Sequence, residues 1–144
     1  MDPVRAIEEN GEDFEIERVT DEEGLSAWED ALGRGFGEGP REAVWVAEMY
    51  RRMGLGDDVP WRHYLGRLGG EPVATSTLFL GAGVAGIYFV STVEEARRRG
   101  IGAATTLAPL REAREMGYPV YRRLGFEEYC RIGLYEWRPS DKLA

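Results

Sequence analysis

The residues with the clearest chemical potential form a short loop that combines arginine and glycine. Residues 97–103 (RRRGIGA) follow a strongly apolar, strand-like segment and precede a helix-like one. Small residues at a helix start let the backbone approach a pyrophosphate, and the free amides and positive dipole end of the helix then stabilise its charge. Adjacent arginines add cationic charge. The pattern indicates a phosphate-binding loop; the alternative is a tight turn with a solvated basic corner.

A second glycine pattern lies earlier in the chain, at residues 81–86 (GAGVAG). Its spacing is that of a dinucleotide-binding fingerprint, which must open a helix and be followed about 20 residues later by an acid. The residues that follow, IYFVSTV (87–93), favour a strand, and no acid lies between Arg97 and Arg111. We therefore interpret this segment as a hairpin turn.

Two segments together resemble the signatures of one enzyme family. Arg97, Gly100 and Gly102 are similar to the Arg/Gln-x-x-Gly-x-Gly/Ala loop of GNAT-family N-acetyltransferases, and YRRLGF (121–126) is similar to a second signature of that family. The two occur in the family order, and the resemblance covers roughly residues 14–138. It implies an α/β fold with a central mixed β-sheet flanked by helices. It also implies acetyl-CoA as donor, the amine of a small molecule or peptide as acceptor, direct attack of the amine, and no metal.

The resemblance also implies roles for individual residues. Backbone amides around residues 98–103 would bind the CoA pyrophosphate, and backbone groups of Thr92 and Val93, at the end of the preceding strand, would pair with the pantetheine arm. Tyr121 would protonate the leaving thiolate, since a neutral tyrosine can donate a proton; Tyr118 is the competing candidate, and either could be a packing aromatic. The expected donor-binding residues are Thr92, Val93, Arg97, Arg98, Arg99, Gly100, Ile101, Gly102 and Ala103.

No motif identifies the general base of the transfer. Glu48 and His63 are candidates, although a single histidine on an apolar strand face is more often structural. Cys130 is most simply a small core residue. Three tryptophans could shape an apolar acceptor pocket or simply pack in the core and at its rim: Trp28, Trp45 and Trp61.

The elements that must position these residues follow from hydrophobic periodicity and turn residues. Thr20 and Glu23 form a capping-box pattern that predicts a helix start. The glycine-rich segment 33–40 predicts a loop, and 87–93, the most apolar strand, is expected to be central. Strands are expected at 14–19, 61–68, 73–80, 87–93 and 127–137, and helices at 21–32, from Pro40 to about Gly54, and at 103–116 with Pro109 as a kink or near its start.

The chain departs from the family after the long helix. The family has a fifth strand there, before the tyrosine helix, whereas residues 117–124 leave room for only one of the two. Either these residues keep the helix role and the strand is missing, or they become a strand and the tyrosine is displaced, or a second copy supplies the contact by exchange around 103–126. The first and third alternatives are favoured because Pro119 suits a first helical turn better than a central strand.

Composition limits the remaining possibilities. The chain of 144 residues is expected to hold one domain at 14–138, an acidic leader at 1–13 and a tail at 139–144. One cysteine and one histidine exclude a disulfide framework and a multi-histidine metal site. The net charge of −8 argues against nucleic-acid binding, and the absence of a long apolar run or signal peptide favours a cytoplasmic protein without membrane partners. The alternative to an enzyme is an impaired GNAT-fold module that binds acyl-CoA or a protein. A homodimer is possible in either case.

Overall fold

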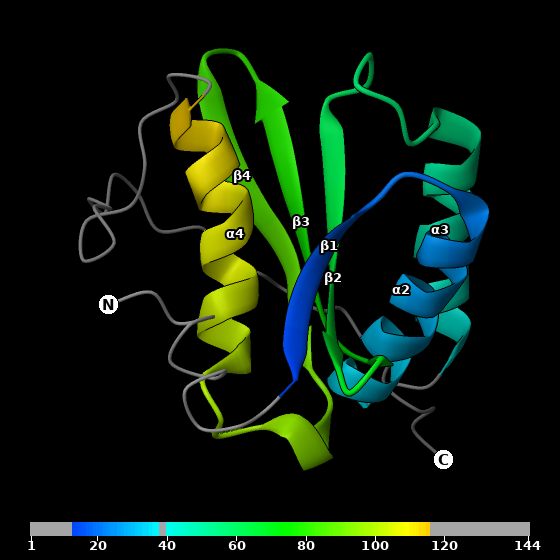
Figure 1. The fold of residues 1–144 in the computed structure, drawn as a ribbon. Coiled ribbons are helices and arrows are strands. Elements are labelled where there is room, and N and C mark those ends of the chain that lie inside the picture. Colours follow the sequence, from blue (N-terminus) through cyan, green and yellow to red (C-terminus); the bar gives the residue numbers. More distant parts are fainter. Residues whose placement is uncertain (1–12, 38–39, 116–144) are drawn as a thin grey trace, which may run out of the picture.

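Two helices cover one face of an antiparallel sheet and a third helix covers the other (Figure 1). The computed structural model describes residues 13–37 and 40–115. The strands are β1 (Phe14–Val19), β2 (Trp61–Leu68), β3 (Glu71–Gly81) and β4 (Val84–Thr92). The helices are α2 (Glu22–Phe36), α3 (Pro40–Met53), the short 3-10 helix η1 (Glu94–Ala96) and α4 (Ile101–Glu115).

The four described strands pair in the order β1-β2-β3-β4, each antiparallel to its neighbour. The predicted α/β class and helix-flanked sheet are confirmed, while the parallel pair of a mixed sheet would need a strand outside the described residues. The middle of both β2 and β3 is buried, because helices cover both faces of these strands. Trp28, Tyr50 and Leu65 fill the α2/α3 side, and Phe14 and Ile101 the α4 side.

Helix α2 differs from its prediction at both ends. Its N-cap is Asp21 rather than Thr20, and the Asp21 carboxylate accepts a hydrogen bond from the Gly24 amide at 2.8 Å. The predicted loop at 33–40 is wrong for residues 33–36, which continue the helix until Gly37, whose positive φ of 69° ends it. Gly35, in this last turn, makes room for close packing against Ser91 of β4 rather than for a turn.

The β3–β4 connection confirms the hairpin interpretation of residues 81–86. Ala82 and Gly83 form a two-residue turn with φ of 51° and 77°, as a type I′ hairpin requires, and no helix follows. Strand β4 begins earlier than predicted and, among the described strands, lies at the edge of the sheet, whereas β2 and β3 are central. Its side chains Val84, Tyr88 and Val90 are exposed, so the strand's apolar character does not reflect a central position in this sheet.

Helix α4 begins at Ile101, two residues before the predicted start, and contains Pro109 in its interior. Several predictions lie outside the described residues. They are the candidate acids Tyr118 and Tyr121, Cys130, the strand at 127–137, the alternatives for 117–124, and the ends of the chain at 1–12 and 139–144.

Candidate functional site

The 97–103 loop has the backbone geometry of a turn that delivers free amides to a helix start. Arg98 and Gly100 adopt positive φ angles of 63° and 84°, and α4 begins at the next residue. The first amide bonded within the helix is that of Ala104, which donates to the Gly100 carbonyl at 3.0 Å. The preceding amides of the first turn, those of Ile101, Gly102 and Ala103, have no helical acceptor and are oriented for an anion.

Gly102 is the point where this helix start meets the end of β4. A Cβ atom added at Gly102 would lie 3.2 Å from the Thr92 Oγ1 atom, tighter than an ordinary contact. A larger side chain would therefore fill the narrow space between the helix start and the strand end. The structure brings together two of the predicted donor-binding residues, Thr92 and Gly102.

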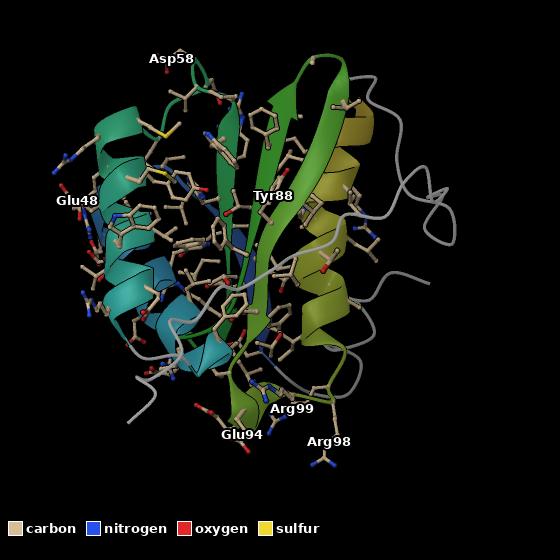
Figure 2. All side chains as sticks on the ribbon, turned by 180° about the vertical axis from the view of Figure 1, so that it is seen from behind. Glu48, Asp58, Tyr88, Glu94, Arg98 and Arg99 are labelled. Carbon is tan, nitrogen blue, oxygen red and sulfur yellow. The ribbon has the colours of Figure 1, made fainter. Side chains whose placement is uncertain are left out.

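The three arginines of the loop occupy different environments. The Arg97 guanidinium donates to the Thr92 carbonyl at 3.0 Å and to the Gly35 carbonyl at 2.9 Å, and so joins the end of β4 to the end of α2. The Arg98 side chain projects away from the molecule, and Arg99 is exposed beside η1 (Figure 2). Arg97 thus has a structural function within the loop, and Arg98 faces solvent.

The backbone at the end of β4 alternates between inward and outward groups. The Val93 amide donates to the Val73 carbonyl at 2.9 Å, and the Val93 carbonyl accepts from Ala96 at 3.0 Å, so both groups of Val93 are used within the chain. In an antiparallel ladder the neighbouring residue points its backbone groups to the opposite side. Thr92, which is paired with Ala74, therefore turns its amide toward the outer edge of β4.

A β-bulge interrupts the middle of β4. Thr75 is opposite Ser91 but Thr77 is opposite Tyr88, so β4 carries one extra residue in between. Phe89 has a positive φ of 50°, and its carbonyl accepts a hydrogen bond from the Thr75 hydroxyl at 2.8 Å. A bulge bends the strand and redirects side chains. Here the rings of Tyr88 and Phe89 both lie on the α2/α3 side, against Trp61 and Trp28 respectively.

His63, one candidate base, belongs to the core. It is 1% exposed, its ring centroid lies 4.0 Å from that of Tyr50, and its Nδ1 is 2.9 Å from the Thr77 hydroxyl. Burial, aided by the positive charge of Arg18, lowers the pKa of His63 to about 4. The imidazole is therefore neutral at pH 7 and packed within the core, which matches its structural interpretation.

Glu48, the other candidate base, lies on the outer surface of α3 (Figure 2). Its carboxylate pairs with Arg52 at 2.9 Å and approaches Arg51 at 4.0 Å, so it belongs to a helix-surface ion-pair network. Sequence reasoning missed a second glutamate, Glu42, near the start of the same helix. The available signal was the i, i+4 spacing from Glu42 to the buried Val46.

Glu42 lines an apolar hollow of about 110 Å³ beside the bulge. The hollow lies between the C-terminal turn of α2, the start of α3 and β4, and its walls include Leu32, Phe36, Val46 and Phe89. Among the described residues of this lining Glu42 is the one carboxylate, and it is exposed. A carboxylate at the mouth of an apolar hollow can accept a proton from a bound amine.

The three candidate tryptophans separate clearly in the structure. Trp28 is fully buried in the core, Trp45 is 71% exposed on α3, and Trp61 is partly buried beside Tyr88. Only Trp61 therefore combines exposure with proximity to the bulge.

Residues 13–37 and 40–115 contain no group of three or more histidine, cysteine or acidic residues placed to hold a metal ion. No helix in the described ranges has the length and apolarity needed to cross a membrane.

Comparisons with known proteins agree on one family. The sequence profile described as an acetyltransferase (GNAT) domain matches residues 3–136. A search of curated protein sequences finds no match. Among solved structures, a GCN5-related N-acetyltransferase from Kribbella flavida is similar, with a TM-score of 0.57 and 24% identity over 79% of this chain and 46% of that one. The chain thus spans about half the length of the Kribbella protein.

Two further structures match over most of both chains. The aminoglycoside N-acetyltransferase AAC(6')-Iy in complex with CoA has a TM-score of 0.64 and 16% identity, over 90% of this chain and 97% of that one. An acetyltransferase of Trypanosoma brucei has a TM-score of 0.60 and 21% identity, over 87% and 100%. These likenesses show the fold, and the family match covers nearly the whole sequence. The chain belongs to the GNAT acetyltransferase family.

Proposed function

We propose that this protein transfers the acetyl group of acetyl-CoA to an amine of a small molecule or peptide. Family membership supports acetyl transfer in general. The single observation that carries the donor assignment is the close approach of Gly102, in the first turn of α4, to Thr92 at the end of β4. This approach leaves the free amides of a helix start beside an outward-facing strand amide, which suits a phosphate joined to an amide-containing arm.

In this proposal each element of the loop has a separate task. The amides of Ile101, Gly102 and Ala103 bind the pyrophosphate, and Arg98 and Arg99 add positive charge at the rim. The Thr92 amide pairs with the pantetheine arm. Arg97 holds the strand end in place through the carbonyls of Thr92 and Gly35. The solved complex of AAC(6')-Iy with CoA supports CoA as the donor carrier in this fold.

The reaction itself is placed beside the bulge of β4. The acceptor amine loses a proton to Glu42, directly or through water, and its nitrogen forms a bond to the acetyl carbon. The bond between that carbon and the CoA sulfur breaks, and the thiolate takes a proton. The sequence resemblance assigns this last proton to Tyr121, with Tyr118 as the alternative; both lie outside the described residues.

Donor binding is tested by calorimetric titration of acetyl-CoA into the wild-type protein and into Gly102→Val. Valine fills the space between helix and strand, so we expect donor affinity to fall at least tenfold. Because the same side chain would meet the Thr92 hydroxyl, the double variant with Thr92→Ala serves as the control: it relieves the internal contact and should restore thermal stability but not donor binding.

Transfer is tested separately by following thiol release from acetyl-CoA with a panel of amines. We expect release that depends on the amine and that is lost in Tyr121→Phe. If acetyl-CoA does not bind at millimolar concentration, the transferase proposal is wrong. Binding without release would instead identify an acyl-CoA-binding module that does not catalyse transfer.

A further inference from the structure

Three aromatic rings lie side by side on the α2/α3 side of the sheet, at the end away from the 97–103 loop. Trp61 on β2 and Phe79 on β3 are cross-strand partners with ring centroids 4.7 Å apart. Tyr88 on β4 lies 5.7 Å from Trp61 and is 48% exposed (Figure 2). We call these three residues the aromatic patch. Its rings meet at 48° and 65°, tilted and edge-to-face arrangements of the kind that aromatic pairs prefer.

A buried hydroxyl group beside the aromatic patch has no hydrogen-bond partner among the described residues. Tyr50 lies 5.4 Å from Trp61, is fully buried, and its hydroxyl has no hydrogen-bond partner in the described part of the chain. Burial raises the pKa of Tyr50 above its ordinary value, and the negative charge of an ionised Tyr88 would raise it further. Buried hydroxyls are rarely left unpaired, so this one is a candidate partner for a ligand.

The aromatic patch is continuous with the bulge where the proposed transfer takes place. Tyr88 directly precedes Phe89, and Phe89 lines the apolar hollow that contains Glu42. Because of the extra residue in β4, the rings of Tyr88 and Phe89 lie on the same side of the sheet instead of alternating. Phe89 and Tyr88 therefore join the hollow to the aromatic patch along one face of the sheet.

The chemistry of the aromatic patch favours one class of acceptor. Polycationic amines are held by several carboxylates, and among the described residues the two acids of the loop before β2 do not face the aromatic patch. Asp57, in the loop before β2, is paired with Arg18, and Asp58 projects from the top of that loop away from Tyr88 (Figure 2). Flat rings instead bind other rings through stacking and edge-to-face contacts.

We propose that the aromatic patch binds the body of the acceptor and that the acceptor is an amine bearing an aromatic ring. This inference rests on the proposed function and adds the substrate class to it. Tyr88 and Trp61 contact the ring. Aminoglycosides, the acceptors after which the structural neighbour AAC(6')-Iy is named, are excluded by this proposal as preferred acceptors of this chain.

The test uses the full chain saturated with CoA, which has no acetyl group to transfer. We titrate 2-phenylethylamine, 2-cyclohexylethylamine or spermidine and follow the indole N–H resonances of the tryptophans by NMR. The Trp61 resonance is assigned from its loss in Trp61→Leu. The binding variant is Tyr88→Ser, which removes an exposed ring, and the matched control is Trp45→Leu, which removes a more exposed ring outside the aromatic patch.

We expect 2-phenylethylamine to shift the Trp61 resonance and to bind at least tenfold more tightly than spermidine, with 2-cyclohexylethylamine between them. Tyr88→Ser should weaken 2-phenylethylamine about fivefold to tenfold, and Trp45→Leu should leave it unchanged. Equal or tighter binding of spermidine overturns the inference, as does unchanged binding in Tyr88→Ser. Failure of CoA itself to bind contradicts the proposed function, whereas titrating the amines without CoA still reports on the aromatic patch.

Discussion

The Ser76 hydroxyl on β3 donates a hydrogen bond of 2.7 Å to the Thr105 carbonyl in the middle of α4. Thr105 lies four residues before Pro109, and proline has no amide hydrogen, so the helix itself offers this carbonyl no partner. The sheet supplies the missing donor. This explains why Pro109 is tolerated inside α4, the helix whose first turn faces the end of β4.

Replacing Ser76 with alanine should destabilise the fold by about 1–3 kcal/mol, because it leaves the buried Thr105 carbonyl unsatisfied. The loss should be smaller in a Pro109→Ala background, where the new amide at position 109 can donate to Thr105. Urea unfolding of the four proteins in this double-mutant cycle measures the difference. Equal losses in both backgrounds would show that Ser76 does not compensate for the proline.

Arg97→Met should lower the free energy of unfolding by about 1–2 kcal/mol, since it removes the donors of the Thr92 and Gly35 carbonyls. It should also weaken acetyl-CoA binding by loosening the strand end. Arg98→Met, in the adjacent solvent-facing position, should change stability by less than about 0.5 kcal/mol. Thermal unfolding compares the two, and equal losses of stability in both variants would contradict the separation of their structural roles.

Sequence reasoning located the elements better than the side chains that matter at the site. Alternating residues predicted the strands at 14–19 and 61–68, and β-branched residues predicted the one at 73–80, whereas β4 begins three residues before its predicted start. The turn chemistry of residues 81–86 predicted the hairpin. The bulge at Phe89 was not predictable, because a register shift depends on the facing strand and not on local residue types. The loop predicted at 33–36 was wrong for a similar reason. A glycine-rich pattern predicts a turn, but it cannot show that the missing side chain at Gly35 lets α2 pack close to β4.

That close approach gives a stability prediction at Gly35. A Cβ atom there would lie 1.9 Å from the Ser91 hydroxyl oxygen. Gly35→Ala should therefore destabilise the protein by roughly 1–3 kcal/mol, although alanine favours helices more than glycine does. In a Ser91→Ala background, which also removes a buried hydroxyl without a hydrogen-bond partner among the described residues, the loss should shrink. Chemical unfolding of both pairs checks this, and stabilisation by Gly35→Ala alone would refute the contact.

The buried His63 gives a pH dependence of stability. Its folded pKa of about 4 lies below its unfolded value of about 6.5, so the unfolded chain takes up this proton at a higher pH than the folded chain. The contribution of the neutral His63 ring to the free energy of unfolding is therefore fully present above about pH 6.5 and is lost as the pH falls toward 4.

The loss attributable to His63 is on the order of 3 kcal/mol across this range. It is measured as the difference between the wild-type protein and His63→Gln in urea unfolding at several pH values. Carboxylates titrate in both proteins and cancel in this difference. Parallel stability curves for the two proteins between pH 4 and 6.5 would show that His63 is not held neutral.

Glu42 and Glu48 provide a matched pair for testing the base. Both are exposed glutamates of α3, but Glu42 lines the hollow beside Phe89, and Glu48 is held by Arg52. Glu42→Gln should lower kcat/KM for the amine at neutral pH by about 100-fold or more, because general-base catalysis contributes factors of this size. Glu48→Gln should have little effect. Raising the pH supplies more unprotonated amine and should recover much of the loss in Glu42→Gln, since the amine then needs no base. A loss that persists at high pH would instead mean that Glu42 positions the acceptor rather than taking its proton.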